Sequence, residues 1–417
     1  DAKRNTFIAA LYFDDVRAGL AYAELSVGEF AATEVIAPAP EELPAAVERE
    51  LLRIAPAELL VPASQKDQAP DIGAIVTQTD DWAWRQHTAR ELLQEHFRVA
   101  SLEAFGLEER PAALRAAGAL LQYLRETQAG NPPYLDDLVV YRTDTYMTLD
   151  AATRRNLELL EGVRGGRESA LVAVLDRTRT PMGARLLRRW LGQPLLDVGA
   201  IVQRQERVAA LVEESLARMQ LGELLAGVAD LERLANRLVT ERITPRELQH
   251  LGRSLATLPR IAELLDQRPE LATLVTFPDL QPVAELVARA LVDDPPVALG
   301  QGAVIRPGFA PELDGLRSRA HAAREWIASL EQRERERTGI RSLKVGYNKV
   351  FGYYIEVSHA NRHLVPDDYQ RKQTLVGAER YITPELKEYE QLVLHAEERI
   401  AALETDVYRR VVGEIAV

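Results

Sequence analysis

The stretch SLKVGYNKVFGYYIEVSHANRH, residues 342–363, decides how the second half of the chain is interpreted. Apolar and polar residues alternate from Leu343 to Tyr347 and again from Tyr353 to Val357. A period of two is typical of β-strands with one packed face, so a hairpin is predicted here. Its other face would present amine, amide and hydroxyl donors. Gly346 and Gly352 would allow close approach to the backbone.

Two long helical patterns flank this hairpin. Before it, apolar residues recur at spacings of three and four: Leu313, Leu316, Ala320, Ala323, Ile327 and Leu330. After it, the same spacing connects Leu386, Tyr389, Val393, Ala396, Ile400, Leu403 and Val407. Thr383-Pro384 is a typical helix start. Heptads of this kind predict two helices, each about 40 Å long, that pack as an antiparallel coiled-coil arm with the hairpin at its tip.

Charge is distributed unevenly along the chain. The net charge is −12, which disfavours binding to a polyanion over the whole surface. Only six lysines occur, and four of them lie between residues 344 and 387. Any contact with nucleic acid is therefore expected at the tip. The candidate residues for contact with a DNA backbone are Lys344, Asn348, Lys349, Ser358, His359 and Arg362.

Two other interpretations of the tip stay open at this stage. The hairpin could be a structural cap that closes the coiled coil, with solvated charges. It could also belong to a coiled-coil scaffold whose tip binds protein. The spacing of His359 and His363 resembles a metal motif, but no third ligand is in view, so no metal is expected.

The first part of the chain has a different pattern. Residues 7–36 alternate as strands, and helical segments and a short apolar run follow, which predicts a small α/β domain that ends near residue 110. From residue 111 the pattern is almost entirely helical. In that region Thr180 is placed as an N-cap before Pro181, and Pro194 limits the helix. The fold class is thus α+β, multidomain and mostly helical.

Several classes of function find no support. Cysteine is absent, which excludes disulfides and thiol catalysis, and no apolar run approaches the roughly 20 residues of a membrane span. A cytoplasmic protein is expected. No lysine precedes Ser or Thr, so there is no Walker A loop, and no catalytic set converges. Asp14, Asp15 and Glu24 could suggest metal-binding carboxylates of a nuclease, although a turn and a strand face explain them better.

Three segments carry a family resemblance. Residues 343–390 (LKVGYNKVFGYYIEVSHANRHLVPDDYQRKQTLVGAERYITPELKEYE) closely resemble the clamp and returning lever helix of bacterial MutS mismatch-recognition proteins. Residues 175–195 (LDRTRTPMGARLLRRWLGQPL) are similar to the core signature of that family, and residues 19–30 (GLAYAELSVGEF) to its connector. The match covers essentially the whole chain in the family's order.

The resemblance implies a domain plan and a function. It implies an RNase H-like connector at 1–110, a helical lever or core domain at 111–318 and 378–417, and a clamp at 319–377. The clamp would contact the backbone of double-stranded DNA, and the connector would relay conformational state and dock a MutL-type partner. Intact family members are homodimers that use ATP and Mg²⁺.

The resemblance also implies what this chain lacks. None of the eight phenylalanines has Glu two residues later, so the Phe-x-Glu mismatch reader of the family is not found. The sequence also stops before any ATPase pattern. We therefore expect a central MutS fragment that is not an enzyme by itself and holds no cofactor.

Overall fold

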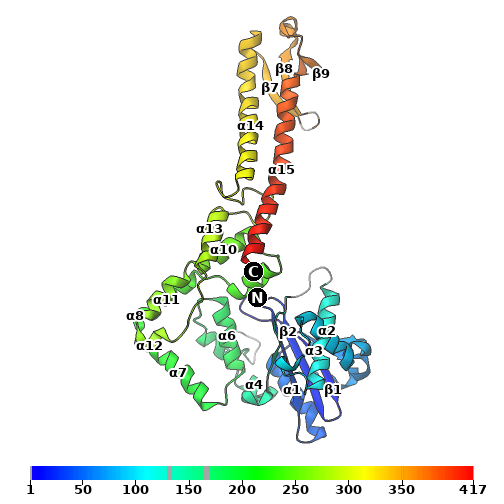
Figure 1. Ribbon diagram of the computed structural model, residues 1–417, viewed down its shortest axis with the longest axis vertical. Coiled ribbons are helices and arrows are strands. Elements are labelled where there is room, and N and C mark those ends of the chain that lie inside the picture. Colours follow the sequence, from blue (N-terminus) through cyan, green and yellow to red (C-terminus); the bar gives the residue numbers. More distant parts are fainter. Residues whose placement is uncertain (1, 129–133, 163–168, 349, 351, 417) are drawn as a thin grey trace. The chain divides into compact units, whose positions relative to one another are not determined.

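The computed structural model describes residues 2–128, 134–162, 169–348, 350 and 352–416. Its backbone forms two compact units, and each is described by itself. The first contains Asp1–Ile243 and His250–Ala284, and the second contains Thr244–Gln249 and Glu285–Val417. Helices dominate, and both units also contain strands (Figure 1). The predicted class, a multidomain α+β protein, is confirmed.

A six-stranded sheet forms the beginning of the first unit. Its strands are β1 (Ile8–Asp14), β2 (Arg17–Glu24), β3 (Glu29–Ile36), β4 (Glu58–Pro62), β5 (Ile75–Thr79) and β6 (Val139–Val140). They are arranged in the order β5-β4-β1-β2-β3-β6. β1, β2 and β3 form an antiparallel meander, whereas β4 lies parallel to β1 and β5 parallel to β4. The prediction of strands over residues 7–36 is confirmed.

Both faces of this sheet are covered by helices. α2 (Gln86–Phe97) and α3 (Pro111–Thr127) supply one apolar cluster, which includes Ala21 and Ala23 of β2. α1 (Leu43–Ile54) supplies the other, which includes Leu20 and Tyr22. Because the two alternating sets of β2 each meet a helical layer, almost the whole strand is buried. The alternating residues of β2 therefore belong to two faces of the sheet, and both faces are packed against helices.

The remainder of the first unit is helical. Its helices are α4 (Ala151–Asn156), α5 (Leu171–Leu175), α6 (Pro181–Gly192), α7 (Val198–Glu213), α8 (Ser215–Ala226), α9 (Leu231–Val239), α11 (Leu258–Asp266) and α12 (Pro269–Ala272). α10 (Pro245–Leu255) and α13 (Gln281–Ala290) contribute residues to both units. The predicted start of α6 is confirmed, since Thr180 Oγ1 accepts a hydrogen bond of 3.1 Å from the N–H of Gly183.

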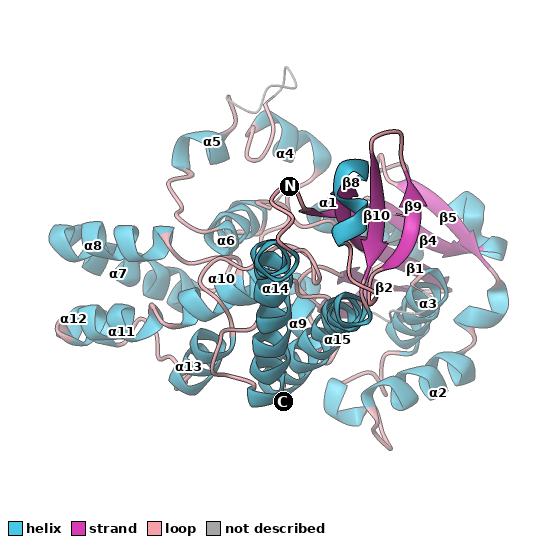
Figure 2. Ribbon diagram, turned by 90° about the horizontal axis from the view of Figure 1, so that it is seen from above, coloured by secondary structure: helices cyan, strands magenta, loops and turns pink. Residues whose placement is uncertain are grey.

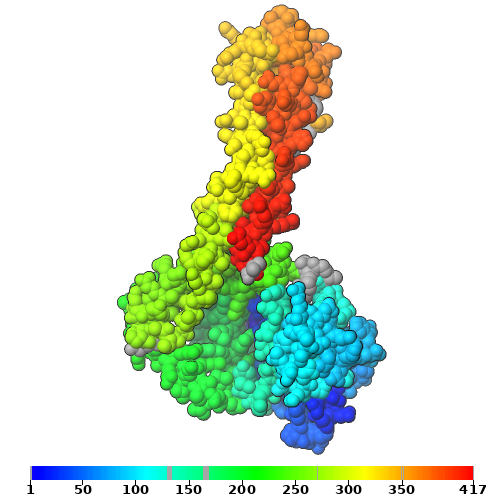
Figure 3. Space-filling view, viewed as in Figure 1, coloured from blue at the N-terminus to red at the C-terminus, as the bar shows by residue number. Residues whose placement is uncertain are grey.

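Two long helices form most of the second unit. α14 (Pro311–Thr338) and α15 (Pro384–Ile415) have 28 and 32 residues and lie side by side (Figures 1 and 3). At 1.5 Å per residue, each is about 40 to 50 Å long. All six apolar residues predicted for the first helix are buried. In the second, Leu386, Val393, Ala396 and Val407 are buried, and Tyr389, Ile400 and Leu403 are half-buried.

The start of α15 also follows the sequence prediction. Thr383 Oγ1 accepts a hydrogen bond of 3.0 Å from the N–H of Leu386, and Pro384 is the first helical residue. Such a cap satisfies one of the donors that the first turn of a helix leaves unpaired. Among the helices that the structure describes, none combines the length and apolar character required to cross a membrane.

Candidate functional site

A four-stranded antiparallel sheet joins the end of α14 to the start of α15, and we call it the tip sheet. Its strands are β7 (Lys344–Asn348), β8 (Gly352–Ser358), β9 (Gln370–Thr374) and β10 (Ala378–Ile382). They lie in the order β7-β8-β10-β9. The predicted hairpin is confirmed as β7 and β8, which pair from Lys344 opposite Glu356 to Asn348 opposite Gly352. The sequence analysis missed β9 and β10.

The inner face of the tip sheet is anchored on the two long helices. Ile355 and Val357 are 0% and 1% exposed and share a cluster with Ile327 of α14 and Leu386 of α15. Beside this cluster Trp326 and Tyr389 stack with ring centroids 4.0 Å apart. The apolar side chains of the hairpin therefore fix the sheet on the helices. The polar side chains that alternate with them lie on the opposite face, outside this core.

The outer face carries a row of polar side chains that crosses all four strands. Lys344 lies opposite Glu356, Glu356 opposite Arg380, and Arg380 opposite Gln373. Arg380 Nε donates to Glu356 at 2.9 Å, and its Nη1 donates to Gln373 at 3.0 Å. The guanidinium also lies 4.1 Å from the ring centroid of Tyr354. This row fixes Arg380 and Glu356 to each other, whereas Lys344 at its end is exposed.

The two glycines of the hairpin are close to other parts of the tip. A Cβ atom on Gly346 would lie 2.6 Å from the hydroxyl oxygen of Tyr354. Gly352 has a φ of +86°, and a Cβ atom there would lie 1.9 Å from Oε1 of Glu390 in α15. The close approach predicted for these glycines is thus made by side chains of the protein itself. Gly352 combines a left-handed backbone with a tight contact.

Three predicted contact residues lie in the hairpin. Lys344 is exposed and has no ion pair with any residue that the structure describes. Asn348 is half-buried, and its Oδ1 accepts a hydrogen bond of 2.8 Å from the N–H of Val350, so it stabilises the turn. Lys349 lies outside the described residues. The role of these residues as DNA contacts stays a prediction.

The other three lie where β8 continues into the 3₁₀ segment η6 (His359–Leu364). Ser358 Oγ lies 3.3 Å from Nδ2 of Asn361, which donates to it. His359 Nε2 lies 3.0 Å from the backbone oxygen of Leu375 in the β9–β10 turn. Arg362 is 61% exposed at its side chain and lies 3.5 Å from the carboxylate of Glu379. All three are thus accessible or half-buried at one corner of the tip sheet, and each also has a local partner.

Glu379 organises that corner. It is 3% exposed, accepts a hydrogen bond from the hydroxyl of Tyr381, and lies 3.6 Å from Arg371 as well as 3.5 Å from Arg362. The Tyr381 hydrogen bond, followed by the neighbouring arginines and His359, holds the pKa of the Glu379 carboxyl below its usual range. Burial and the Glu379 carboxylate raise the pKa of Tyr381 to about 12. The carboxylate therefore positions two cations at the surface.

The structure adds basic residues that the sequence analysis did not select. Arg341, Arg371 and Lys372 are exposed on the tip. Arg341 and Lys372 have no charged partner among the described residues. Lys372 belongs to the lysine cluster noted in the sequence, and Arg371 precedes it, so this pair could have been found by extending the basic window to residue 372.

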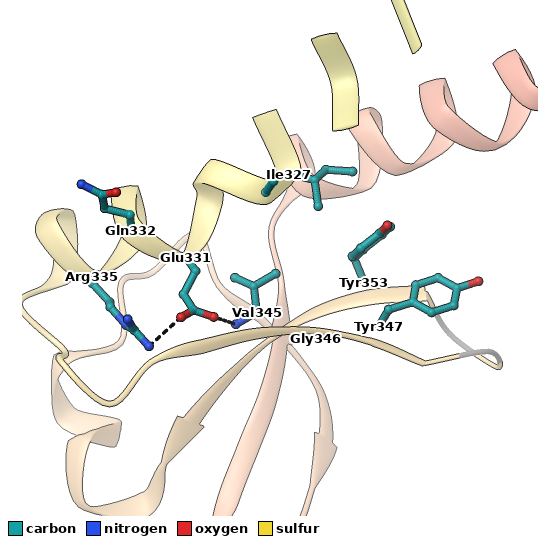
Figure 4. Close-up of a pocket in the computed structure, with 9 residues that line it drawn as sticks. Ile327, Glu331, Gln332, Arg335, Val345, Gly346, Tyr347 and Tyr353 are labelled. Carbon is teal, nitrogen blue, oxygen red and sulfur yellow. Dashed lines mark hydrogen bonds and ion pairs between the residues drawn. The ribbon is translucent and has the colours of Figure 1, made fainter. Parts of the chain in front are cut away.

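A shallow groove of about 450 Å³ lies between α14 and β7 (Figure 4). Glu331 reaches into it, accepts a hydrogen bond of 2.9 Å from the N–H of Val345, and pairs with Arg335 at 2.6 Å. Glu331 and Arg335 are four residues apart, the spacing at which side chains of one helix meet. One outward-facing donor of the edge strand β7 is therefore already occupied by α14.

Another acid of the same helix end is not solvated. Glu334 is 8% exposed and accepts a hydrogen bond of 2.8 Å from the hydroxyl of Tyr369, which precedes β9. It also pairs with Arg337 at 2.7 Å. The end of α14 is thereby connected to the tip sheet by polar contacts as well as apolar ones.

The carboxylates considered for a nuclease do not converge. Asp14 pairs with Arg17 at one end of the β1–β2 ladder, and Glu24 lies just beyond the pair Ile8–Ala23 at the other end. At about 3.3 Å per residue, they are about 20 Å apart and cannot share a metal ion. Glu24 is buried and accepts hydrogen bonds from Ser26 and Val27. Within the described part of the chain no three potential metal ligands form a group, and His359 and His363 gain no third ligand.

Fold and tip together define a multidomain α+β protein that carries a sheet with exposed cations at the end of two paired long helices. The family models of MutS domain II and MutS domain III match residues 6–136 and 152–417. The chain belongs to the MutS family, as the resemblance predicted.

Individual relatives agree with this assignment. The chain is 44% identical over 418 residues to the DNA mismatch repair protein MutS of Dehalococcoides mccartyi (strain CBDB1), covering 99% of this chain and 48% of that protein. It is 41% identical over 426 residues to the protein of the same name from Salinibacter ruber, covering 99% and 46%. To the protein of the same name from Symbiobacterium thermophilum it is 44% identical over 429 residues, covering 99% of this chain and 48% of that protein. The chain spans about half the length of these curated relatives.

Proposed function

We propose that this chain acts in DNA mismatch repair as part of a MutS protein and that its tip sheet contacts the backbone of duplex DNA. The observation that carries the proposal is the group of exposed cations on the tip, Arg341, Lys344 and Lys372, in a chain of net charge −12. An acidic protein that binds a polyanion needs such a local concentration of positive charge. Membership in the MutS family supplies the kind of polyanion.

The proposed contact positions the protein without reading sequence. Lysine and arginine side chains on a sheet can pair with phosphate oxygens, and such contacts fix orientation on a duplex. Arg362 and Arg371 are held at the surface by one buried carboxylate, Glu379, which reduces the freedom that they would lose on binding phosphate. The inner face is committed to the helices, so the outer face and its edges are the surfaces that remain for DNA.

The division into domains belongs to this proposal. We assign residues 1–110 to an RNase H-like connector, 111–318 and 378–417 to the lever or core, and 319–377 to the clamp. The antiparallel meander continued by two parallel strands supports the RNase H-like class of the connector, and α3, which packs on the same sheet, would extend this domain past residue 110. With these bounds most of α14 belongs to the clamp and α15 belongs to the lever, and together the two helices would carry the tip sheet as a coiled-coil arm. The connector would relay conformational state and dock a MutL-type partner, and the intact protein would be a homodimer that uses ATP and Mg²⁺.

Fluorescence anisotropy with labelled duplex DNA tests the proposal. Binding should be weak, should be similar for a matched duplex and one with a single mismatch, and should decrease as salt rises from about 50 to about 200 mM. Binding that does not depend on salt, or no binding at low salt, would contradict the proposal and favour a coiled-coil scaffold whose tip binds protein.

A further inference from the structure

The strand β5 forms one edge of the six-stranded sheet (Figure 2). Its five residues, Ile75–Thr79, pair in parallel with β4 along their whole length. Apart from β4, its main neighbour is the 3₁₀ segment η2 (Ala63–Gln68), which follows β4 in the chain. The other edge strand, β6, has only two residues, and a very short edge strand gives a partner little to pair with. β5 is therefore the longer open edge.

The direction of the free backbone groups of β5 follows from one hydrogen bond. The N–H of Ile75 donates to the backbone oxygen of Ala57 at 3.0 Å, on the side of β4. Backbone groups alternate in direction along a strand, so Ile75, Thr77 and Thr79 face β4. Val76 and Gln78 therefore direct both N–H and C=O away from the sheet. Neither residue makes another hydrogen bond within the described part of the protein.

None of the usual protections of an edge strand is found on β5. It contains no proline, no lysine and no other charged residue. Ile75 is 72% exposed and Val76 is 40% exposed. By contrast, the edge strand β7 of the tip sheet has the N–H of Val345 occupied by Glu331. An exposed, apolar edge with unpaired backbone groups is a template for an additional strand.

The charges around β5 indicate which kind of strand could pair with this edge. Four exposed acids flank it, two before and two after, and one exposed lysine of η2, Lys66, offsets part of their charge: the acids are Asp67, Asp71, Asp80 and Asp81. Asp81 also accepts hydrogen bonds from Ser64. In antiparallel pairing of two copies, the acidic ends of both strands would meet, which is unfavourable, and nucleic acid would be repelled likewise. A basic extended segment would meet the acids at both ends.

We propose that β5 is a docking edge where an extended, basic segment of a partner protein adds a strand through Val76 and Gln78. Its backbone would exchange hydrogen bonds with these two residues, its apolar side chains would cover Ile75 and Val76, and its flanking cations would approach the four acids. The proposal does not depend on the DNA contact at the tip. Variants of β5 should leave salt-dependent DNA binding unchanged, so the two proposals can fail separately.

A synthetic peptide tests the edge directly. The probe is a fluorescent peptide of about ten residues, with alternating valine and threonine between lysine pairs. The control is a peptide of equal charge with proline at alternate positions, which cannot form a ladder. The alternating peptide should bind in anisotropy experiments, and the proline peptide should not. Equal binding of both peptides, or no binding of either at millimolar concentration, would overturn the proposal.

Hydrogen exchange identifies where the peptide binds. In the free protein the amides of Val76 and Gln78 should exchange rapidly, whereas Thr77 should be protected by β4. Saturating peptide should slow the exchange of Val76 and Gln78 and leave Thr77 unchanged. Peptide binding without this alternating protection would show that charge attraction alone is responsible, and the strand-addition proposal would be wrong.

Matched variants complete the test. Val76→Pro with Gln78→Pro removes the two outward N–H donors without removing a donor to β4. This double variant should bind the alternating peptide with an affinity that is lower by about tenfold or more. Val76→Thr with Gln78→Thr keeps the donors and should bind like the parent protein. Asp71→Lys with Asp80→Lys should also weaken binding, whereas Glu103→Lys, at an exposed position outside the edge, should not. Circular dichroism verifies folding, and unchanged affinity in a folded proline variant would overturn the proposal.

Discussion

Replacement of Val357 by alanine should destabilise the tip sheet, whereas the same replacement at Val376 should not. Val357 is 1% exposed in the cluster that joins β8 to α14 and α15, and Val376 is fully exposed in the β9–β10 turn. Removing two buried methyl groups costs about 0.8 kcal/mol for each, and the remaining cavity adds to this. We expect a loss of about 2 kcal/mol for Val357→Ala and less than about 0.5 kcal/mol for Val376→Ala.

Hydrogen exchange of residues 352–358 and 378–382 measures this difference locally. If these strands open together, a loss of about 2 kcal/mol makes their amides exchange about thirtyfold faster. Amides of the six-stranded sheet in the first unit serve as an internal reference and should not change. Equal acceleration in both variants, or none in Val357→Ala, would refute the inference that the inner face of β8 fixes the tip sheet on the helices.

Two further predictions concern polar contacts at the tip. Thr383→Ala should remove the cap of α15 and cost about 1 kcal/mol, measured as faster exchange in its first turn, while Thr383→Ser should restore most of it. Glu379 has a lowered pKa, so its contribution to stability should be present above its unfolded value of about 4.3 and be lost as pH falls through its folded pKa. The free energy of unfolding, measured as pH falls, should therefore decrease less steeply in Glu379→Gln than in the parent protein. An identical slope in both proteins would contradict a lowered pKa for Glu379.

The sequence predicted features that depend on local spacing. The two long helices follow from apolar residues three and four apart, and the starts of α6 and α15 follow from Thr-Pro pairs, because caps and amphipathic stripes are set by neighbours in sequence. The hairpin β7–β8 follows from alternation. These signals require no knowledge of distant residues, and the structure confirms each of them.

The missed features depend on distant partners. β9 and β10 are recognisable as strands mainly because β10 pairs with β8, and β9 itself is exposed at every position, so it has no alternation to detect. The buried acids Glu334, Glu379 and Glu404 read as surface residues in sequence. Each has a partner far away in the chain. Glu334 accepts a hydrogen bond from Tyr369, Glu379 forms ion pairs with Arg362 and Arg371, and Glu404 accepts from the N–H groups of Val304 and Ile305 at 2.9 and 3.0 Å. Local composition does not encode such pairs.

The salt dependence of DNA binding tests the central claim most directly. Lys344→Ala with Lys349→Ala removes two predicted phosphate contacts, and Lys3→Ala with Lys66→Ala removes the same charge from the first unit. Each phosphate contact contributes about −0.9 to the slope of log K against log salt. The tip variant should therefore flatten the slope by about two and weaken matched and mismatched duplexes alike, while the control keeps the parent slope. An unchanged slope in a folded tip variant, or an equal change in the control, would contradict a DNA contact at the tip.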